Sequence, residues 1–166
     1  MRPSRWSTCC AGSRRVRPRG GPGRGGGADV VGRRSKAREC AFQILYQWEV
    51  SREPIERVIE GFWRVRSGTP AAREMAERLA RGAQAEAKLL DQLIEENASN
   101  WRLERIAAVD KNILRLGAFE LTREQTPPRV VIDESIEIAK RFGEADSPAF
   151  VNGVLDAIMK KTAAKP

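Results

Sequence analysis

The fold is decided by the stretch Asp110-Lys111-Asn112-Ile113-Leu114-Arg115-Leu116-Gly117-Ala118-Phe119-Glu120-Leu121-Thr122-Arg123. At 100° per residue its apolar side chains cover most of the circumference of a helix. A helix that is apolar nearly all round is buried among other elements, so the stretch predicts the central helix of a bundle. Glu120 falls on the same side as Ile113 and Gly117. A buried carboxylate is costly alone, so we expect a structural partner for it, such as an Arg or a helix N-terminus.

Helical periodicity extends on both sides of this stretch, from Arg33 onward, without an alternating strand-like run. Pro54 and Pro148 suit first helical positions, Ser147 suits an N-cap, and Gly143 suits the residue after a helix end. The fold class is therefore all-α, a compact helical bundle of about seven helices. The predicted elements cover about 34–49, 54–66, 70–96, a short turn near 101–106, 110–124, 129–142 and 147–161.

The segment 34–49 carries one apolar stripe on a helical wheel, formed by Ala37, Ala41, Ile44, Leu45 and Trp48. Two aromatic residues, Phe42 and Tyr46, point away from that stripe. Either they stack on nucleic-acid bases or dock a protein partner, or this helix is packed on both sides. The hydroxyl of Tyr46 suits a contact that stays wet.

Positive charge is concentrated at the start of the chain. Residues 1–38 hold eleven Arg or Lys against Asp29 alone, a net charge of +10, whereas the whole chain carries +8. The remaining residues therefore sum to −2. A basic arm that leads into a helix on a nearly neutral body indicates a polyanionic partner, and nucleic acid fits best.

Residues 1–32 are rich in glycine and proline, and such a segment buries too little apolar area to offset its chain entropy. We expect a disordered, basic Gly/Arg-rich arm over 1–32, followed by one domain over 33–166. Two interpretations of the arm are open. It is an RNA-binding arm of the Arg-Gly type, or it is an upstream extension from a misassigned start codon, with the true start near Val30 or Val31.

The composition argues against an enzyme. The chain has no histidine, which removes histidine-based zinc sites, histidine-activated nucleophiles and the commonest general base. Cys9, Cys10 and Cys40 form neither a metal-binding spacing nor a disulfide framework. We expect no catalytic residue, no metal and no cofactor. Without an 18-residue apolar run or a signal peptide, we also expect no membrane contact and a cytoplasmic location.

The last predicted helix begins with Asp146-Ser147-Pro148-Ala149-Phe150. Its core stripe is Val151, Val154, Leu155 and Ile158, and Phe150 lies at the edge of that stripe, beside Asp146. Free backbone N–H groups at a helix start bind phosphate well, although Asp146 opposes an anion there. Phe150 is thus either part of a binding surface or an ordinary packing residue.

Several motifs, in order and with matching spacing, resemble the family of the transcription antitermination factor NusB over about residues 33–161. The first is Arg38-Glu39-Cys40-Ala41 with Gln43, Leu45-Tyr46 and Trp48. The central helix supplies Val109-Asp110-Lys111, Ile113-Leu114-Arg115 and Phe119-Glu120-Leu121. The others are Ile132-Asp133-Glu134-Ser135-Ile136-Glu137-Ile138-Ala139-Lys140 and Phe150-Val151-Asn152-Gly153-Val154-Leu155-Asp156.

The resemblance implies a compact all-helical protein without catalytic activity. Members of this family bind the boxA element of ribosomal RNA leader transcripts, a single-stranded RNA, together with NusE, a small-subunit ribosomal protein. The heterodimer joins an RNA polymerase elongation complex with other Nus factors, which then resists termination. A homodimer is also compatible, since some relatives self-associate through the surface that would bind RNA.

Matching positions imply roles for individual residues. Tyr46 and Asp110 would lie at the NusE interface. Ser35 interrupts the basic lead of the family, and the 60–100 region matches only weakly, so partner contacts there are not carried over. The implied RNA-binding residues are Arg33, Arg34, Lys36, Arg38, Gln43, Asp146 and Phe150.

Two other functions remain open at this point. One is an RNA-binding module of the kind, similar to NusB, that precedes certain ribosomal RNA 5-methylcytosine methyltransferases. The other is a protein-interaction domain without RNA affinity. RNA titrations with and without residues 1–32 and NusE separate these functions.

Overall fold

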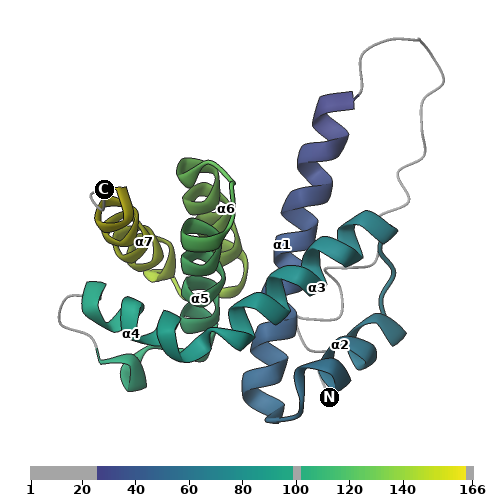
Figure 1. The fold of residues 1–166 in the computed structure, drawn as a ribbon, viewed down its shortest axis with the longest axis horizontal. Helices are drawn as coiled ribbons and strands as arrows, with labels where there is room; N and C mark the ends of the chain where they lie inside the picture. The colour runs from purple at the N-terminus through teal and green to yellow at the C-terminus, as the bar shows by residue number, and fades with distance from the viewer. Residues whose placement is uncertain (1–25, 99–101, 164–166) are drawn as a thin grey trace.

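The computed structural model describes residues 26–98 and 102–163, which form seven α-helices, one short 3-10 helix and no strand (Figure 1). The all-α prediction is therefore confirmed for this part of the chain. The elements are α1 (Gly26–Ser51), α2 (Ile55–Arg64), α3 (Pro70–Ala85), α4 (Ala87–Asn97), η1 (Leu103–Arg105), α5 (Ala108–Arg123), α6 (Pro128–Phe142) and α7 (Ser147–Ala163).

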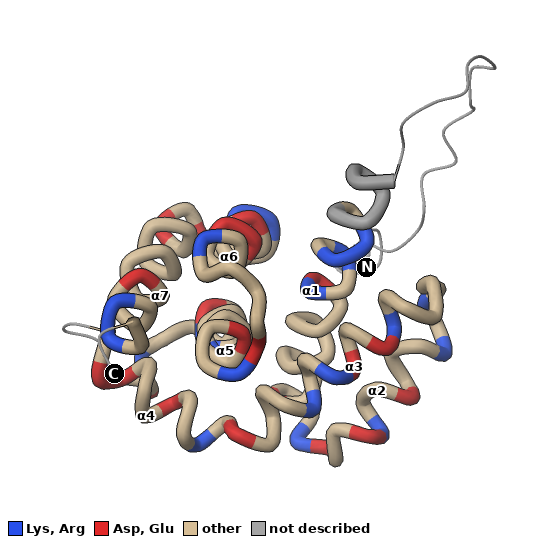
Figure 2. Tube along the Cα trace, turned by 45° about the horizontal axis from the view of Figure 1, so that its top comes forward, with Lys and Arg blue, Asp and Glu red and all other residues tan. Residues whose placement is uncertain are grey.

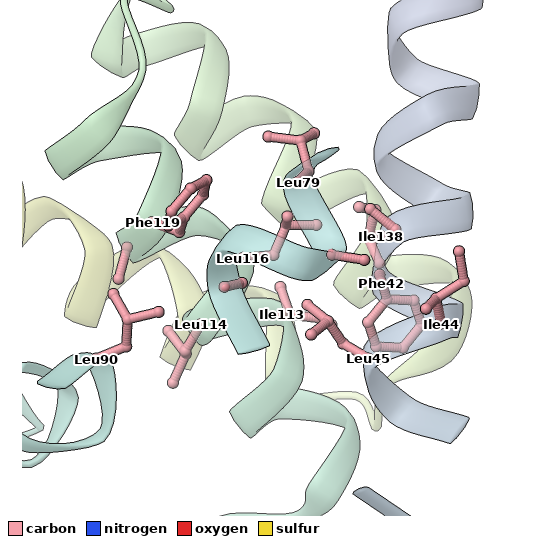
Figure 3. Close-up of a cluster of buried hydrophobic side chains, with 14 of the residues drawn as sticks. Phe42, Ile44, Leu45, Leu79, Leu90, Ile113, Leu114, Leu116, Phe119 and Ile138 are labelled. Carbon is pink, nitrogen blue, oxygen red and sulfur yellow. The ribbon is translucent and has the colours of Figure 1, made fainter. Parts of the chain in front are cut away.

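Helix α5 lies at the centre of the bundle, as its sequence predicts. Every residue from Asn112 to Glu120 is buried, and the helix packs against α1, α3, α4, α6 and α7. Figure 3 shows Ile113, Leu116 and Phe119 of this helix within the apolar core. Dense packing of this kind removes apolar surface from water and drives the fold.

Gly117 allows α5 to approach its neighbours closely. A Cβ atom at this position would lie 2.8 Å from Cδ1 of Leu155 on α7 and 3.0 Å from Oγ of Ser135 on α6. The first distance is shorter than any ordinary carbon contact. The missing side chain therefore lets α6 and α7 pack directly on the central helix.

Helix α1 lies between two layers, with α5 and α6 on one side and α2 and α3 on the other (Figures 1 and 2). It begins at Gly26, earlier than the predicted start at 34, so part of the predicted arm is helical. The rest of that arm, residues 1–25, lies outside the described residues. Phe42 is completely buried, and its ring lies 5.2 Å from that of Phe142 on α6. For Phe42 the packing interpretation is therefore correct.

The segment 70–96 forms two helices instead of the single predicted helix. The chain leaves helical geometry at Glu86, where φ is −99° and ψ is 11°. No proline or N-cap signal marks this break. It is imposed by tertiary packing, since α3 packs on α1 whereas α4 turns to pack on α5 and α7. Arg123 at the end of α5 donates to both carboxylate oxygens of Glu86, at 2.9 and 3.0 Å.

A buried ion pair joins α1 to the central helix. Arg38 donates from Nε to both carboxylate oxygens of Glu120, at 3.0 and 2.9 Å, and from Nη2 to Oε2 at 2.8 Å. Only 3% of Arg38 and 2% of Glu120 is exposed. The expectation that Glu120 has a structural partner is thus confirmed. Burial raises the pKa of Glu120, and Arg38 offsets part of that rise.

Removing one member of this pair is expected to destabilise the fold strongly. Arg38→Ala leaves the Glu120 carboxylate buried and unpaired, which typically costs about 3–5 kcal/mol. Urea unfolding followed by circular dichroism measures the loss. The matched control is Arg64→Ala, because Arg64 pairs with Glu60 where both side chains are 71% exposed, and that change should cost below about 1 kcal/mol. Equal losses in the two variants would contradict a structural role for the buried pair.

Candidate nucleic-acid and partner interface

The basic residues at the start of α1 face two different directions. Arg33 and Arg34 are exposed, whereas Lys36 is half-buried. Positions 34 and 36 are two residues apart and so point to nearly opposite sides of a helix. Arg34 lines a pocket of about 450 Å³ with Arg78 of α3. Lys36 instead forms an ion pair with Glu39 at 2.9 Å, on the side of α6.

Two of the predicted RNA-binding residues lie in the interior. Arg38 is occupied by Glu120, as described above, and Gln43 is only 2% exposed. The amide nitrogen and oxygen of Gln43 make no hydrogen bond with the described residues. Arg38 lines the pocket of Arg34 but is only 3% exposed, and Gln43 is enclosed, because α1 is packed on both sides along this stretch.

A second pocket, of about 260 Å³, brings together three residues that the sequence predicted for two different interfaces. Asp110, at the first turn of α5, faces the start of α7, where Asp146 and Phe150 lie. Asp146 is exposed, and Asp110 and Phe150 are half-buried. The full lining consists of Arg105, Ile106, Ala107, Asp110, Glu144, Asp146, Ser147 and Phe150.

The carboxylate of Asp110 is only partly satisfied. Its Oδ1 atom is buried without a hydrogen-bond partner among the described residues. Burial raises the pKa of Asp110, the hydroxyl of Ser147 counteracts that rise, and the negative charge of Glu144 adds to it. A buried acceptor without a partner costs free energy. A ligand that donates a hydrogen bond or brings a positive charge recovers that cost, so the pocket is suited to a basic or N–H-bearing group.

Tyr46 lies in a third recess, of about 300 Å³, between the end of α1 and α2. The residues that line it include Phe62, Val58 and Val50, and Val50 is 61% exposed. An exposed large apolar side chain beside a half-buried tyrosine is the composition of a protein-docking patch. Tyr46 is either a residue that contacts a ligand or partner, or a residue of a helix packed on both sides. Its partial exposure in this recess is compatible with the first interpretation.

A polar network ties the end of α1 to the start of α5. Glu49 forms ion pairs with Lys111 and with Arg115, the latter at 2.9 Å, and accepts a hydrogen bond from Asn112. Arg115 also donates to Asp91 of α4 at 2.6 and 2.7 Å. This network places Tyr46, which lies one turn before Glu49, at the same end of the bundle as Asp110.

The predicted site residues therefore form two groups at opposite ends of α5. The start of α1 lies beside the C-terminal part of α5, through the Arg38–Glu120 pair. The Asp110 pocket lies at the N-terminal end of α5. Ten residues at 1.5 Å per residue separate Asp110 from Glu120, a distance of about 15 Å. A ligand that contacts both groups must be extended.

A metal centre and a membrane-spanning helix each have structural requirements that can be compared with the described residues. They contain no group of three His, Cys, Asp or Glu side chains that could hold a metal ion. Among these residues no helix is long and apolar enough to cross a membrane.

A model of the NusB family matches residues 35–160. The chain belongs to the NusB family. The transcription antitermination protein NusB of Anaeromyxobacter dehalogenans is 46% identical over 132 residues, which cover 78% of this chain and 92% of that protein. The NusB protein of Sorangium cellulosum is 45% identical over 129 residues, which cover 77% and 92% of the two chains.

Solved structures of NusB proteins share this fold. T. maritima NusB superposes with a TM-score of 0.71 at 39% identity, covering 77% of this chain and 91% of that one. A structure of the antitermination factors NusB and NusE in complex with dsRNA contains a chain with a TM-score of 0.70 at 30% identity, covering 78% of this chain and 97% of that one. The family resemblance noted from the motifs is confirmed.

The structure adds surface residues that sequence reasoning missed. Val50 was not singled out, although an apolar residue four positions after Tyr46 shares its helical face. Arg78 was missed because its approach to Arg34 depends on how α3 crosses α1. Arg141 lies on the polar side of α6 in the sequence pattern, yet it forms an ion pair with Glu39 of α1. Only contacts between distant segments reveal the last two.

Replacing the carboxylate in the pocket should stabilise the isolated protein. A raised pKa means that the folded state favours protonated Asp110, so this group contributes stability below its ordinary value of 3.8 and loses it as the pH rises through the folded-state value. Asp110→Asn removes the desolvated charge and should raise the free energy of unfolding near neutral pH by about 0.5–1 kcal/mol.

Urea titrations near neutral pH and below pH 3.8 measure this effect, and the difference between variant and wild type should disappear at the lower pH. Asp133→Asn, at an exposed position on α6, is the control and should change stability by less than about 0.5 kcal/mol. A loss of stability in Asp110→Asn at neutral pH would show that the carboxylate is satisfied in solution.

Proposed function

We propose that this chain is a cytoplasmic transcription antitermination factor that binds the boxA RNA of ribosomal RNA leader transcripts together with NusE. In this proposal the two proteins and the RNA join an RNA polymerase elongation complex with other Nus factors, and the chain catalyses no reaction. The observation that carries the proposal is the division of the surface. Exposed cations lie at one end of α1, and an acidic, aromatic pocket and an apolar recess lie at the other.

The cationic end supplies the attraction to phosphate. Arg33 and Arg34 are exposed, and Figure 2 shows basic residues where the coloured part of α1 begins. Phosphate contacts of this kind provide affinity without sequence preference and weaken as salt rises. Sequence preference then comes from groups that contact bases, and Phe150 at the start of α7 has an aromatic face of the kind that stacks on an unpaired base.

The other end supplies the contacts to NusE. Tyr46 and Val50 offer apolar area, and Asp110 offers an unpartnered acceptor at the same end of the bundle. A partner bound there adjoins the pocket of Asp146 and Phe150, so RNA can bridge both proteins and bind more tightly than to either alone. A NusB chain solved with NusE and dsRNA has the same fold, which supports a joint surface for protein and RNA.

The RNA part of the proposal is tested with the double variant Arg33→Gln/Arg34→Gln. A fluorescein-labelled single-stranded boxA RNA is titrated at several salt concentrations and followed by anisotropy. Because two phosphate contacts are lost, affinity should fall at least about tenfold and the salt slope should fall by about 1.4.

The control removes the same charge elsewhere, in Arg64→Gln/Lys88→Gln on the exposed faces of α2 and α4. Its RNA affinity should stay within about twofold of wild type, since general attraction alone is weak at moderate salt. Equal losses in both double variants would contradict a defined RNA surface at the start of α1. A duplex of the same sequence, titrated in parallel, shows whether the unpaired strand is preferred.

The partner part of the proposal is tested with Tyr46→Ala. NusE should raise the affinity of wild-type protein for boxA RNA by at least about fivefold, the lower range of coupling between two ligands. Tyr46→Ala should remove most of this gain, because it removes aromatic area from the docking patch, and should leave the affinity for RNA alone unchanged. No gain from NusE in the wild-type titration would contradict joint binding.

A further inference from the structure

A single carboxylate holds two cations from different helices at the junction of α1 and α6. Glu39 of α1 accepts a hydrogen bond from Nζ of Lys36 through Oε1, at 2.9 Å. Its other oxygen, Oε2, accepts one from Nη1 of Arg141 on α6. The three groups form a bridge, which we call the Glu39 bridge, and its net charge is +1.

The exposure of these side chains is strongly unequal. Glu39 is 7% exposed, whereas Lys36 is 38% exposed and Arg141 is 55% exposed. The carboxylate is thus covered, while both cations face water. A guanidinium has five N–H donors, and the hydrogen bond to Glu39 uses only one of those of Arg141. Arg141 is therefore oriented by a buried anchor and still able to bind an anion.

The Glu39 bridge lies in the middle of the α1–α6 contact. On one side, Oγ of Ser35 donates to Glu134 at 2.7 Å, and on the other the rings of Phe42 and Phe142 lie 5.2 Å apart. The contact starts at the basic end of α1 and runs along α6 towards the turn that leads to Asp146. The bridge therefore occupies the space between the two groups of predicted RNA-binding residues.

We propose that Arg141 is a further phosphate-binding residue of the RNA surface, with Glu39 as the residue that positions it. The RNA backbone then runs from the start of α1 over the Glu39 bridge to the pocket of Asp146 and Phe150. This inference rests on the proposed RNA-binding function. It explains how an extended strand is held across the roughly 15 Å along α5 that separate Glu120 from Asp110.

Orientation is what distinguishes Arg141 from its neighbour Lys140. Lys140 is similarly exposed, at 57%, but its partner is Glu137 on the same helix, which is 68% exposed. In such an exposed pair both side chains are mobile, salt screens their attraction, and the pair contributes little free energy. A guanidinium anchored to a buried carboxylate loses less side-chain entropy when it binds phosphate. Lys140 therefore provides a matched control one position away, with the same change in net charge.

The main test compares Arg141→Gln with Lys140→Gln in the full chain, with a fluorescein-labelled single-stranded boxA RNA at several salt concentrations. Arg141→Gln should weaken binding by about three- to tenfold and lower the salt slope by about 0.7, the value for one phosphate contact on a single strand. Lys140→Gln should leave the affinity within about twofold and the slope unchanged. Equal effects of the two substitutions would overturn the proposal.

A second readout locates the contact on the RNA. Single phosphates of the boxA RNA are replaced in turn by uncharged methylphosphonates, and each RNA is titrated against both proteins. One replacement should weaken binding to wild type but not to Arg141→Gln, which identifies the phosphate over Arg141. If every replacement weakens binding to both proteins by the same factor, Arg141 contacts no phosphate and the proposal fails.

Glu39→Gln tests the positioning role. This change raises the net charge of the protein by one, so general attraction alone predicts tighter binding. If the carboxylate orients Arg141, binding should instead weaken by about two- to fivefold at constant fold, since the cation must then be ordered by the RNA itself. Circular dichroism confirms the fold of each variant, and tighter binding by a folded Glu39→Gln protein would overturn the positioning role.

The outcomes separate this inference from the function on which it rests. If the wild-type chain binds boxA RNA no better than an RNA of scrambled sequence, with or without NusE, the proposed function fails. If wild type binds boxA RNA and Arg33→Gln/Arg34→Gln weakens it, but Arg141→Gln behaves like Lys140→Gln, the function stands and only the path over the Glu39 bridge is wrong.

Discussion

The ion pair between Arg38 and Glu120 fixes the register of α1 on the central helix, and the positions of the surface residues of α1 follow from it. Three hydrogen bonds of 2.8–3.0 Å leave the two helices little freedom to slide or rotate. With Arg38 facing α5, helical geometry keeps Arg34 on nearly the same side, in the pocket shared with α3, and turns Glu39 by about 100° towards α6. A buried pair of this kind contributes little net stability, but it excludes alternative packings because each would leave a charge unpaired.

At the N-terminal end of α5, some polar groups are fully paired within the protein whereas one is not. Glu49, Lys111 and Arg115 form a satisfied network that holds α1, α4 and α5 together. The adjacent Asp110 keeps an acceptor oxygen without a partner in a partly apolar pocket. Within the isolated chain this arrangement only costs free energy. An external donor, as in the proposed partner interface, would gain the interaction without first displacing an internal one.

The sequence predicts the fold well because the core helices carry strong periodic signals. The apolar stretch around Ile113 and the stripe of α7 place those helices correctly, and a carboxylate on an apolar face correctly predicts a partner for Glu120. Motif and periodicity are local, however, and fail where geometry depends on crossing helices. The break at Glu86 follows from the different neighbours of α3 and α4. Arg38 looks from sequence like one more basic residue of the lead, and only the packing of α1 on both sides shows that it is buried.

The buried pairing of Arg38 also explains why net charge alone describes the proposed RNA surface poorly. Of the basic residues near the start of α1, Arg38 is neutralised by Glu120 in the interior, whereas Lys36 shares Glu39 with Arg141 at the surface. In the first arrangement Arg38 holds two helices together, and in the second Glu39 positions Lys36 and Arg141. Because the Glu39 side chain is buried and held in place, it restricts the positions of the Lys36 and Arg141 side chains at the surface. The geometry of the surface cations is therefore set by the acidic residues beneath them.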